Sequence, residues 1–193
     1  MQRLCVFCGS SFGNRTVYRE AAKIVGELLA ARNVTLVYGG AHVGLMGELA
    51  NSCLSAGGSV IGVIPQALVD KEIAHRGLTR LHVVATMHER KALMADLADA
   101  FVALPGGSGT WEEYFEVLTW SQLGLQRKAC GLLNIDGYYD ALLSLAGHAV
   151  EEGFLRREHR DLILADTDPE RLVDLLSQYE VPLVDKWIGQ RDR

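Results

Sequence analysis

Hydrophobic positions along the chain follow two alternating patterns. Short, unbroken apolar runs are typical of strands that are covered on both faces of a sheet. Longer stretches repeat their apolar residues at helical spacing, as Ala21, Val25, Leu28 and Leu29 do. The short runs predict strands over Leu4–Cys8, Thr35–Tyr38, Val60–Ile64, Leu81–Ala85, Ala100–Leu104, Ala129–Leu133 and Leu162–Ala165. The longer stretches predict helices over Val17–Ala31, Leu45–Ala56, His88–Ala98, Thr110–Leu123, Tyr139–Glu152 and Asp168–Tyr179.

This order of elements predicts the fold class. Strands that alternate with helices along a whole chain form a parallel sheet with right-handed crossovers. We therefore expect an α/β fold, with a doubly wound, mostly parallel sheet flanked by helices. The length of 193 residues suits a single domain, and no internal repeat or linker interrupts the pattern.

The stretch from Pro65 to Arg80 fits neither pattern well. It carries Glu72, His75 and Arg76 just after a predicted strand. Two interpretations remain open here: a loop that closes over a site, or a surface connection with a short helix.

Composition and charge narrow the possible functions. The chain is 49% hydrophobic and 22% charged, which is typical of a globular protein and excludes disordered, collagen-like and coiled-coil classes. No apolar run approaches the about 20 residues that cross a bilayer. The net charge of -5 provides no electrostatic footprint for nucleic acid or an anionic membrane. We expect a soluble, cytoplasmic protein with neither of these partners.

The cysteines suggest no chemistry. Cys5 and Cys8 are spaced as C-x-x-C, but both lie in the first predicted strand. Residues three apart on a strand point to opposite faces, so the two thiols cannot share a metal ion or form a disulfide. We expect small, buried, reduced side chains.

Glycines gather in three loops, each between a predicted strand and a predicted helix. In a doubly wound sheet such loops lie on one edge, beyond the carboxyl ends of the strands, where ligands bind. Glycine lets backbone N–H groups approach an anion, and a helix N-terminus attracts one. Three such loops favour a phosphate-bearing ligand over ordinary turns, with Gly9, Ser10, Gly39, Gly40 and Gly44 among the expected contacts. The loops contain Gly9 and Gly13; Gly39, Gly40, Gly44 and Gly47; and Gly106, Gly107 and Gly109.

The loops argue against two common phosphate ligands, a nucleoside triphosphate and a dinucleotide cofactor. Gly39–Leu45 lacks the Lys-Ser/Thr pair of a nucleoside triphosphate loop. No G-x-G-x-x-G follows the first strand, and no acidic residue follows Tyr38-Gly39 to bind a cofactor ribose. A nucleoside monophosphate or a sugar phosphate remains.

Two cations occupy an unfavourable position. Thr86 and Glu89 have capping-box spacing, so Arg90 and Lys91 fall in the first turn of a helix, where the helix dipole disfavours positive charge. An anionic ligand above this turn would explain them, and Arg90 would then be a stability liability in the empty protein. The alternative is a pair of solvated surface cations, which suits Lys91 better than Arg90.

Adjacent carboxylates follow the third glycine loop. Glu112 and Glu113 open the next helix, and a carboxylate beside a bound sugar could stabilise an oxocarbenium ion or activate water. Thr110 and Glu113 also have capping-box spacing, which would make Glu113 structural. Adjacent helical residues point about 100° apart, so only one of the two acids can face the sugar directly.

At these two segments the sequence resembles the Lonely Guy family. Pro-Gly-Gly-Ser-Gly-Thr-Trp-Glu-Glu at 105–113 matches the family's PGGxGTxxE motif, and Met-His-Glu-Arg-Lys at 87–91 matches its second signature. The similarity runs from about residue 4 to 180, so we expect one domain over residues 1–180 and a C-terminal tail over 181–193. Further matches lie at 7–11, 38–40, 44–47, 63–65 and 131–134.

The resemblance implies a Rossmann-like homodimer without metal or organic cofactor. Family members cleave cytokinin riboside 5′-monophosphates to the free base and ribose 5-phosphate, and some relatives accept AMP. The resemblance implies that Arg90 and Glu113 are the catalytic pair. The implied substrate contacts are Glu72, Arg90, Lys91, Gly107, Ser108, Gly109, Thr110, Trp111, Glu112, Glu113 and Thr119.

The sequence also bears on three other functions: a decarboxylase, a ligand-binding protein without catalysis, and a structural protein. A lysine decarboxylase, a label this family has carried, needs a Schiff-base lysine, and only Lys91 among five lysines lies in a suitable loop. We reject that label. A non-catalytic protein that binds a nucleotide or a molybdopterin-like ligand is the main alternative, although such a protein gains nothing from Glu113 beside a phosphate. A structural protein, in which the glycines only form turns, does not explain why Arg90 lies at the start of a helix. The sequence does not determine which base is preferred. The next helix carries an aromatic face that is either a dimer interface or ordinary core; it consists of Trp111, Tyr114, Phe115 and Leu118.

Overall fold

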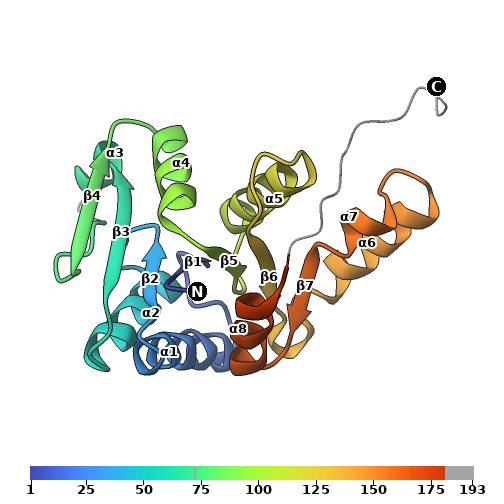
Figure 1. Ribbon diagram of the computed structural model, residues 1–193. Helices are drawn as coiled ribbons and strands as arrows, with labels where there is room; N and C mark the ends of the chain where they lie inside the picture. Colours follow the sequence, from blue (N-terminus) through green and yellow to red (C-terminus); the bar gives the residue numbers. More distant parts are fainter. Residues whose placement is uncertain (72, 181–193) are drawn as a thin grey trace.

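A single parallel sheet organises the described chain. The computed structural model describes residues 1–71 and 73–180. Their seven strands pair in the order β4-β3-β2-β1-β5-β6-β7, and every pairing is parallel (Figure 1). The predicted doubly wound α/β fold is therefore confirmed. The strands are β1 (Arg3–Phe7), β2 (Thr35–Tyr38), β3 (Val60–Pro65), β4 (Arg80–Val84), β5 (Ala100–Ala103), β6 (Ala129–Leu133) and β7 (Ile163–Asp166).

The helices also match the sequence pattern. All six predicted helices are present, with ends within two residues of the predicted ones, while the shortest elements were missed because a single turn shows no periodicity. No helix within the described ranges is both long and apolar enough to cross a membrane. The helices are α1 (Thr16–Ala31), α2 (Gly44–Ser55), α3 (Gln66–Val69), α4 (Met87–Leu97), α5 (Ser108–Gln122), α6 (Asp140–Glu151), α7 (Arg157–Arg160) and α8 (Pro169–Gln178), with a 3-10 turn, η1, at Ile135–Gly137.

Helices cover both faces of the sheet. Alternate residues of β1 enter opposite cores: Leu4 and Val6 pack with α1, α2 and α8, whereas Cys5 and Phe7 pack with α4 and α5 (Figure 1). Cys8 belongs to the first core, so Cys5 and Cys8 lie on opposite sides as predicted, and both thiols are free. The unbroken apolar runs reflect this double coverage.

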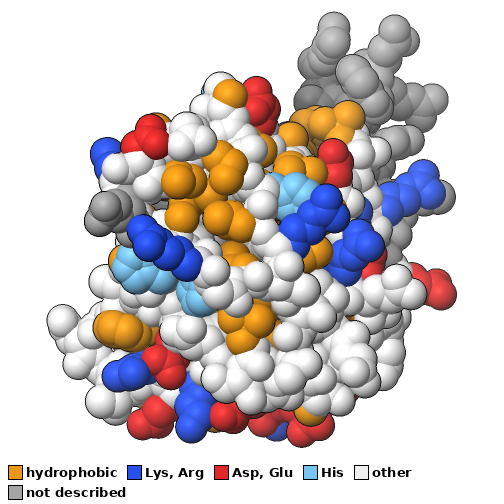
Figure 2. All heavy atoms as spheres, turned by 90° about the vertical axis from the view of Figure 1, so that its left-hand side faces the viewer, with side chains coloured by type: hydrophobic (Ala, Val, Ile, Leu, Met, Phe, Trp, Pro, Cys, Tyr) orange, Lys and Arg blue, Asp and Glu red, His pale blue; other side chains and the backbone are white. Residues whose placement is uncertain are grey.

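The edge of the sheet formed by β4 is less covered than its centre. Strand β4 lies at this edge, and its Val83 is 47% exposed, whereas every residue of β5 is buried. Figure 2 shows this side of the molecule, where apolar side chains gather among histidine and basic side chains. The best-shielded part of the sheet is its middle, around β1 and β5.

The chain reverses direction across the sheet at β1. It builds β2, β3 and β4 outward on one side of β1, then returns to place β5 on the other side. The loops after β1 and β5 therefore lead away to opposite sides and leave a crevice between them, which is the usual ligand position in such sheets. The Gly9 N–H donates to the Pro105 carbonyl across this point at 3.1 Å.

Helices α1 and α2 approach closely at Gly26. A Cβ atom at this residue would lie 2.5 Å from the Leu49 oxygen and 2.9 Å from the Cys53 nitrogen, both in the backbone of α2. Since a backbone cannot yield as a side chain can, only glycine fits here without moving one helix.

We expect Gly26→Ala to lower the free energy of unfolding by about 1–3 kcal/mol, the usual cost of overpacking. Gly147→Ala is the matched control: Gly147 lies in α6 with nothing within 4 Å of the added Cβ. This control should gain about 0.5–1 kcal/mol from helix propensity. Urea unfolding of both variants measures the difference, and equal effects would contradict the close approach.

Candidate active site

A cavity lies at the crevice between β1 and β5. Its volume is about 590 Å³, and it is lined by residues from all three glycine-containing segments together with α4 and α5. The predicted convergence of these segments on one edge of the sheet is confirmed. The sequence-predicted residues in its lining are Ser10, Gly39, Arg90, Gly107, Ser108, Gly109, Thr110, Glu112 and Glu113.

One end of the cavity offers backbone N–H groups. Helix α5 begins at Ser108, and its N-cap residue Gly107 provides no side-chain cap. The first helical hydrogen bond runs from the Trp111 N–H to the Gly107 carbonyl, so the helix itself leaves the N–H groups of Ser108, Gly109 and Thr110 without partners. Such groups at a helix N-terminus bind anions.

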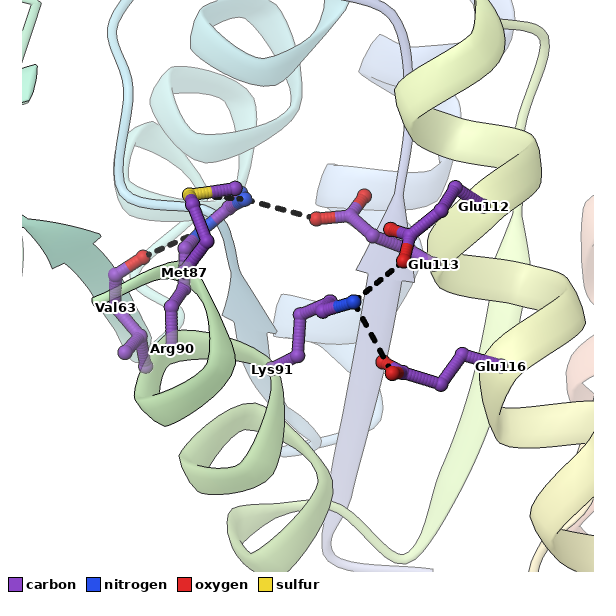
Figure 3. Close-up of polar contacts among 7 residues, drawn as sticks. All are labelled: Val63, Met87, Arg90, Lys91, Glu112, Glu113 and Glu116. Carbon is purple, nitrogen blue, oxygen red and sulfur yellow. Dashed lines mark hydrogen bonds and ion pairs between the residues drawn. The ribbon is translucent and has the colours of Figure 1, made fainter.

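A buried ion pair lies beside this end. Arg90 on α4 and Glu113 on α5 are joined by an Nη1–Oε1 contact of 3.0 Å, and their side chains are only 9% and 11% exposed (Figure 3). The Arg90 Nε donates to the Val63 carbonyl at 3.1 Å, which fixes the guanidinium at the end of β3. A Cβ atom at Gly39 would lie 1.9 Å from Arg90 Nη2, so this glycine is needed to make room for arginine.

The environment of Glu113 tunes its charge. Burial raises the pKa of this carboxyl above its ordinary value of 4.5, and the positive charge of Arg90 opposes that rise. Arg90 therefore favours the ionised form in a place that would otherwise favour the neutral one. A carboxylate held this way can stabilise positive charge that develops on a neighbouring sugar.

The two proposed capping boxes have different outcomes. Thr86 Oγ1 accepts from the Glu89 N–H at 3.1 Å, and Glu89 Oε2 accepts from the Ala85 N–H at 2.9 Å, so Glu89 is structural as predicted. The alternative for Glu113 is wrong, because Thr110 is the third residue of α5 rather than its N-cap and the Glu113 side chain pairs with Arg90. Of the two adjacent acids, Glu113 is therefore the one held by Arg90.

Lys91 lies in a second cluster of charges. Its ammonium contacts Glu112 and Glu116, the latter at 3.1 Å, and its side chain is 11% exposed (Figure 3). Burial alone would lower the pKa of Lys91, but the hydrogen bonds to both carboxylates raise it. Lys91 is not part of the cavity lining. The interpretation of Lys91 as a solvated cation is wrong; it joins α4 to α5.

The remaining predicted contacts lie at varying distances from the cavity. Gly9, Gly40 and Gly44 are outside its lining, where they shape the loops; Gly44 has φ +55° and would place a Cβ atom 2.3 Å from the Ser10 backbone. Trp111 also lies outside the lining and is exposed. Thr119 is in the last part of α5, about 16 Å along the helix from Ser108. Glu72 lies outside the described residues.

Part of the cavity lining is apolar, which was not predicted from the sequence. This part includes Met46 and Met87, together with Leu68 and Ile73 from the stretch between β3 and β4. That stretch is attached to the second glycine segment: His42 N–H donates to the Ile73 carbonyl at 3.0 Å, and a further bond joins His75 N–H to the Gly40 carbonyl at 2.9 Å. The described residues of this stretch therefore combine features of both interpretations: they lie beside the site, and they include the short helix α3.

The structure also corrects the expected cost of Arg90 in the empty protein. Its guanidinium already has an anionic partner in Glu113, so its charge is compensated without a ligand. Removing one member of a buried pair leaves the other charge uncompensated.

Arg90→Gln should therefore lower the free energy of unfolding by about 3–5 kcal/mol. The deficit should shrink as the pH falls from about 8 to about 5, because protonation of Glu113, whose pKa is already raised, removes the buried charge. The double variant Arg90→Gln/Glu113→Gln should recover part of the loss. Urea unfolding at both pH values measures the coupling; a single variant as stable as the parent would contradict it.

Known proteins resemble the chain in sequence. A family model described as "Possible lysine decarboxylase" matches residues 46–176. A probable cytokinin riboside 5′-monophosphate phosphoribohydrolase of Oryza sativa subsp. japonica is 52% identical over 92% of this chain and 78% of its own. The cytokinin riboside 5′-monophosphate phosphoribohydrolase of Rhodococcoides fascians is 55% identical over 86% and 84% of the two chains. The Arabidopsis thaliana enzyme LOG2 is 47% identical over 98% and 88%.

Solved structures resemble it in fold. A molybdenum cofactor binding protein from Rippkaea orientalis superposes with a TM-score of 0.69 at 20% identity, covering 92% of this chain and 96% of its own. The molybdenum cofactor carrier protein of Chlamydomonas reinhardtii does so with 0.68 at the same identity, covering 91% and 95%. At that identity the likeness concerns the fold alone. The family match over residues 46–176 and the relatives of about half-identical sequence along most of both chains show that this chain belongs to the LOG (Lonely Guy) family.

Proposed function

We propose that this chain hydrolyses the N-glycosidic bond of cytokinin riboside 5′-monophosphates and releases the free base and ribose 5-phosphate. The observation that carries the proposal is the buried Arg90–Glu113 pair beside the free N–H groups of α5. The relatives from Rhodococcoides fascians and Arabidopsis thaliana, which bear the name of this activity, support it.

The cavity suits the three parts of such a substrate. The 5′-phosphate binds the N–H groups of Ser108, Gly109 and Thr110, where the dipole of α5 favours an anion. The base packs against the apolar residues of the lining, among them Met46 and Met87. The ribose then lies between them, next to Glu113.

The reaction breaks the bond between C1′ of the ribose and the base nitrogen. Positive charge develops on the ribose as this bond lengthens, and the Glu113 carboxylate stabilises it or activates the attacking water. The water oxygen bonds to C1′, one of its protons is lost, and the base leaves with a proton. Arg90 keeps Glu113 ionised and oriented throughout.

The purified protein should release free base from N6-isopentenyladenosine 5′-monophosphate, measured by chromatography, with AMP as a second substrate. Glu113→Gln keeps the shape of the side chain but removes its charge, so the rate should fall about 10²–10³-fold. Because the ionised form is the active one, kcat/KM should decline on acidification with an apparent pKa above 4.5.

The nucleoside without its 5′-phosphate is the control substrate. Its kcat/KM should be far lower, since the phosphate anchors the sugar beside Glu113. Nucleotide binding without base release would instead favour a non-catalytic carrier, and near-normal turnover by Glu113→Gln would remove the carboxylate from the mechanism.

We further propose that the protein is a homodimer that uses α5. The predicted aromatic face divides in two: Tyr114 and Leu118 are buried in the core, whereas Trp111 and Phe115 are 43% and 41% exposed one turn apart. Two large, neighbouring aromatic side chains on one helix are typical of an interface.

Phe115→Glu should therefore convert a species of twice the chain mass into one of the chain mass, as measured by light scattering after size exclusion. Leu175→Glu is the control, since Leu175 is 39% exposed on α8, on the opposite face of the sheet. A parent protein that already has the mass of a single chain would contradict the dimer.

A further inference from the structure

Three consecutive carbonyl groups precede the anion-binding turn, and each accepts a hydrogen bond from a different group. The Leu104 carbonyl accepts from the Tyr139 hydroxyl at 2.7 Å, and the Pro105 carbonyl accepts from the Gly9 N–H at 3.1 Å. The Gly106 carbonyl accepts from the Tyr138 hydroxyl. The backbone that enters the turn is thus held from outside at every residue.

Two of these bonds set the direction of the N–H group that follows: the bond to the Pro105 carbonyl directs the Gly106 N–H, and the bond to the Gly106 carbonyl directs the Gly107 N–H. Pro105 has no N–H, so the bond from Tyr139 to the Leu104 carbonyl fixes only the path of the chain into the loop. In a trans peptide the C=O and the N–H point in opposite directions, and the described chain has no cis peptide bond. When Tyr138 holds the Gly106 carbonyl on one side of the loop, the N–H of Gly107 points to the other. Gly107 lines the cavity and is the N-cap residue of α5, so this peptide sets the orientation in which the N–H groups of Ser108, Gly109 and Thr110 follow.

The loop has little freedom apart from these bonds. A Cβ atom at Gly106 would lie 2.2 Å from Thr110 Oγ1 and 2.8 Å from the Gly9 nitrogen, so the loop is packed against both its neighbours.

The tyrosines are themselves fixed. Asn134 Oδ1 accepts from the Tyr139 N–H at 2.7 Å, and Asn134 Nδ2 donates to Asp140 Oδ1 at the same distance. The Tyr138 ring packs edge-on against Tyr139 and Tyr18, with centroids 4.9 and 5.7 Å apart. This network gives a role to Asn134 at the end of β6, a residue that the proposed chemistry leaves unused.

We infer that Tyr138 and Tyr139 are positioning residues that orient the Leu104–Gly107 backbone for phosphate binding. The inference rests on the proposed function, because it assigns the phosphate to this turn. Neither hydroxyl is needed for bond cleavage, so their loss should weaken binding of the phosphate in the ground state and the transition state alike.

The test compares Tyr138→Phe and Tyr139→Phe with Tyr114→Phe. Tyr114 is as buried as Tyr139 and belongs to the core against which Tyr138 packs, but its hydroxyl has no hydrogen-bond partner among the described residues. The readouts are KM and kcat on the nucleoside monophosphate, the Kd for ribose 5-phosphate from calorimetry, and the melting temperature.

Each of the first two variants should raise KM and the Kd for ribose 5-phosphate by about three- to tenfold, with kcat changed less than about twofold. Tyr114→Phe should change none of these. An unchanged KM, or a fall in kcat without a rise in KM, would overturn the inference even if the parent enzyme behaves as proposed. A parent protein that binds ribose 5-phosphate no better than ribose would overturn the phosphate site itself, and the inference with it.

Discussion

Two opposite charges, Arg90 of α4 and Glu113 of α5, are buried against each other in the space between the two helices, over the ends of the central strands. Either charge alone would be costly at this depth, and each is tolerated because of the other. Several local features follow from this constraint. Position 39 is a glycine, which leaves its side-chain space to the guanidinium of Arg90. The Val63 carbonyl accepts from Arg90 Nε, while Glu113 contacts Nη1. The glycine-rich turn begins α5 at a point from which Glu113 can meet Arg90.

The second charge cluster strengthens the same junction. Cations at the start of α4 oppose the dipole of their own helix, yet carboxylates from α5 surround them: Glu113 for Arg90, and Glu112 with Glu116 for Lys91. Helices α4 and α5 follow β4 and β5, two strands that are not neighbours in the sheet, and these ion pairs hold the helices at one separation. The width of the cavity between them depends on that separation, so these ion pairs shape the site as well as charge it.

Much of this arrangement could be predicted from the sequence, for reasons that differ between residues. The strands were visible because coverage on both faces makes their apolar runs unbroken, and the glycine segments because parallel strands end on one edge. Arg90 was a candidate because a cation is unfavourable at a helix start. The sequence suggested a ligand as its anionic partner, whereas the structure shows Glu113 in that role. That pairing joins residues on separate helices and has no local signature. The apolar wall was missed because Met46 and Leu68 have the same pattern as core residues.

Fold alone does not separate an enzyme from a carrier here, since molybdenum cofactor proteins share this architecture at 20% identity. The distinction depends on what a carboxylate does beside an anion. Glu113 faces the cavity that holds the free N–H groups of α5, so its charge repels a bound phosphate and weakens ground-state binding. A protein that only binds its ligand would be better without it. The same charge becomes favourable once the ribose turns positive, which happens only as the glycosidic bond breaks. A buried, ionised carboxylate in this position therefore favours the transition state over the substrate, as catalysis requires.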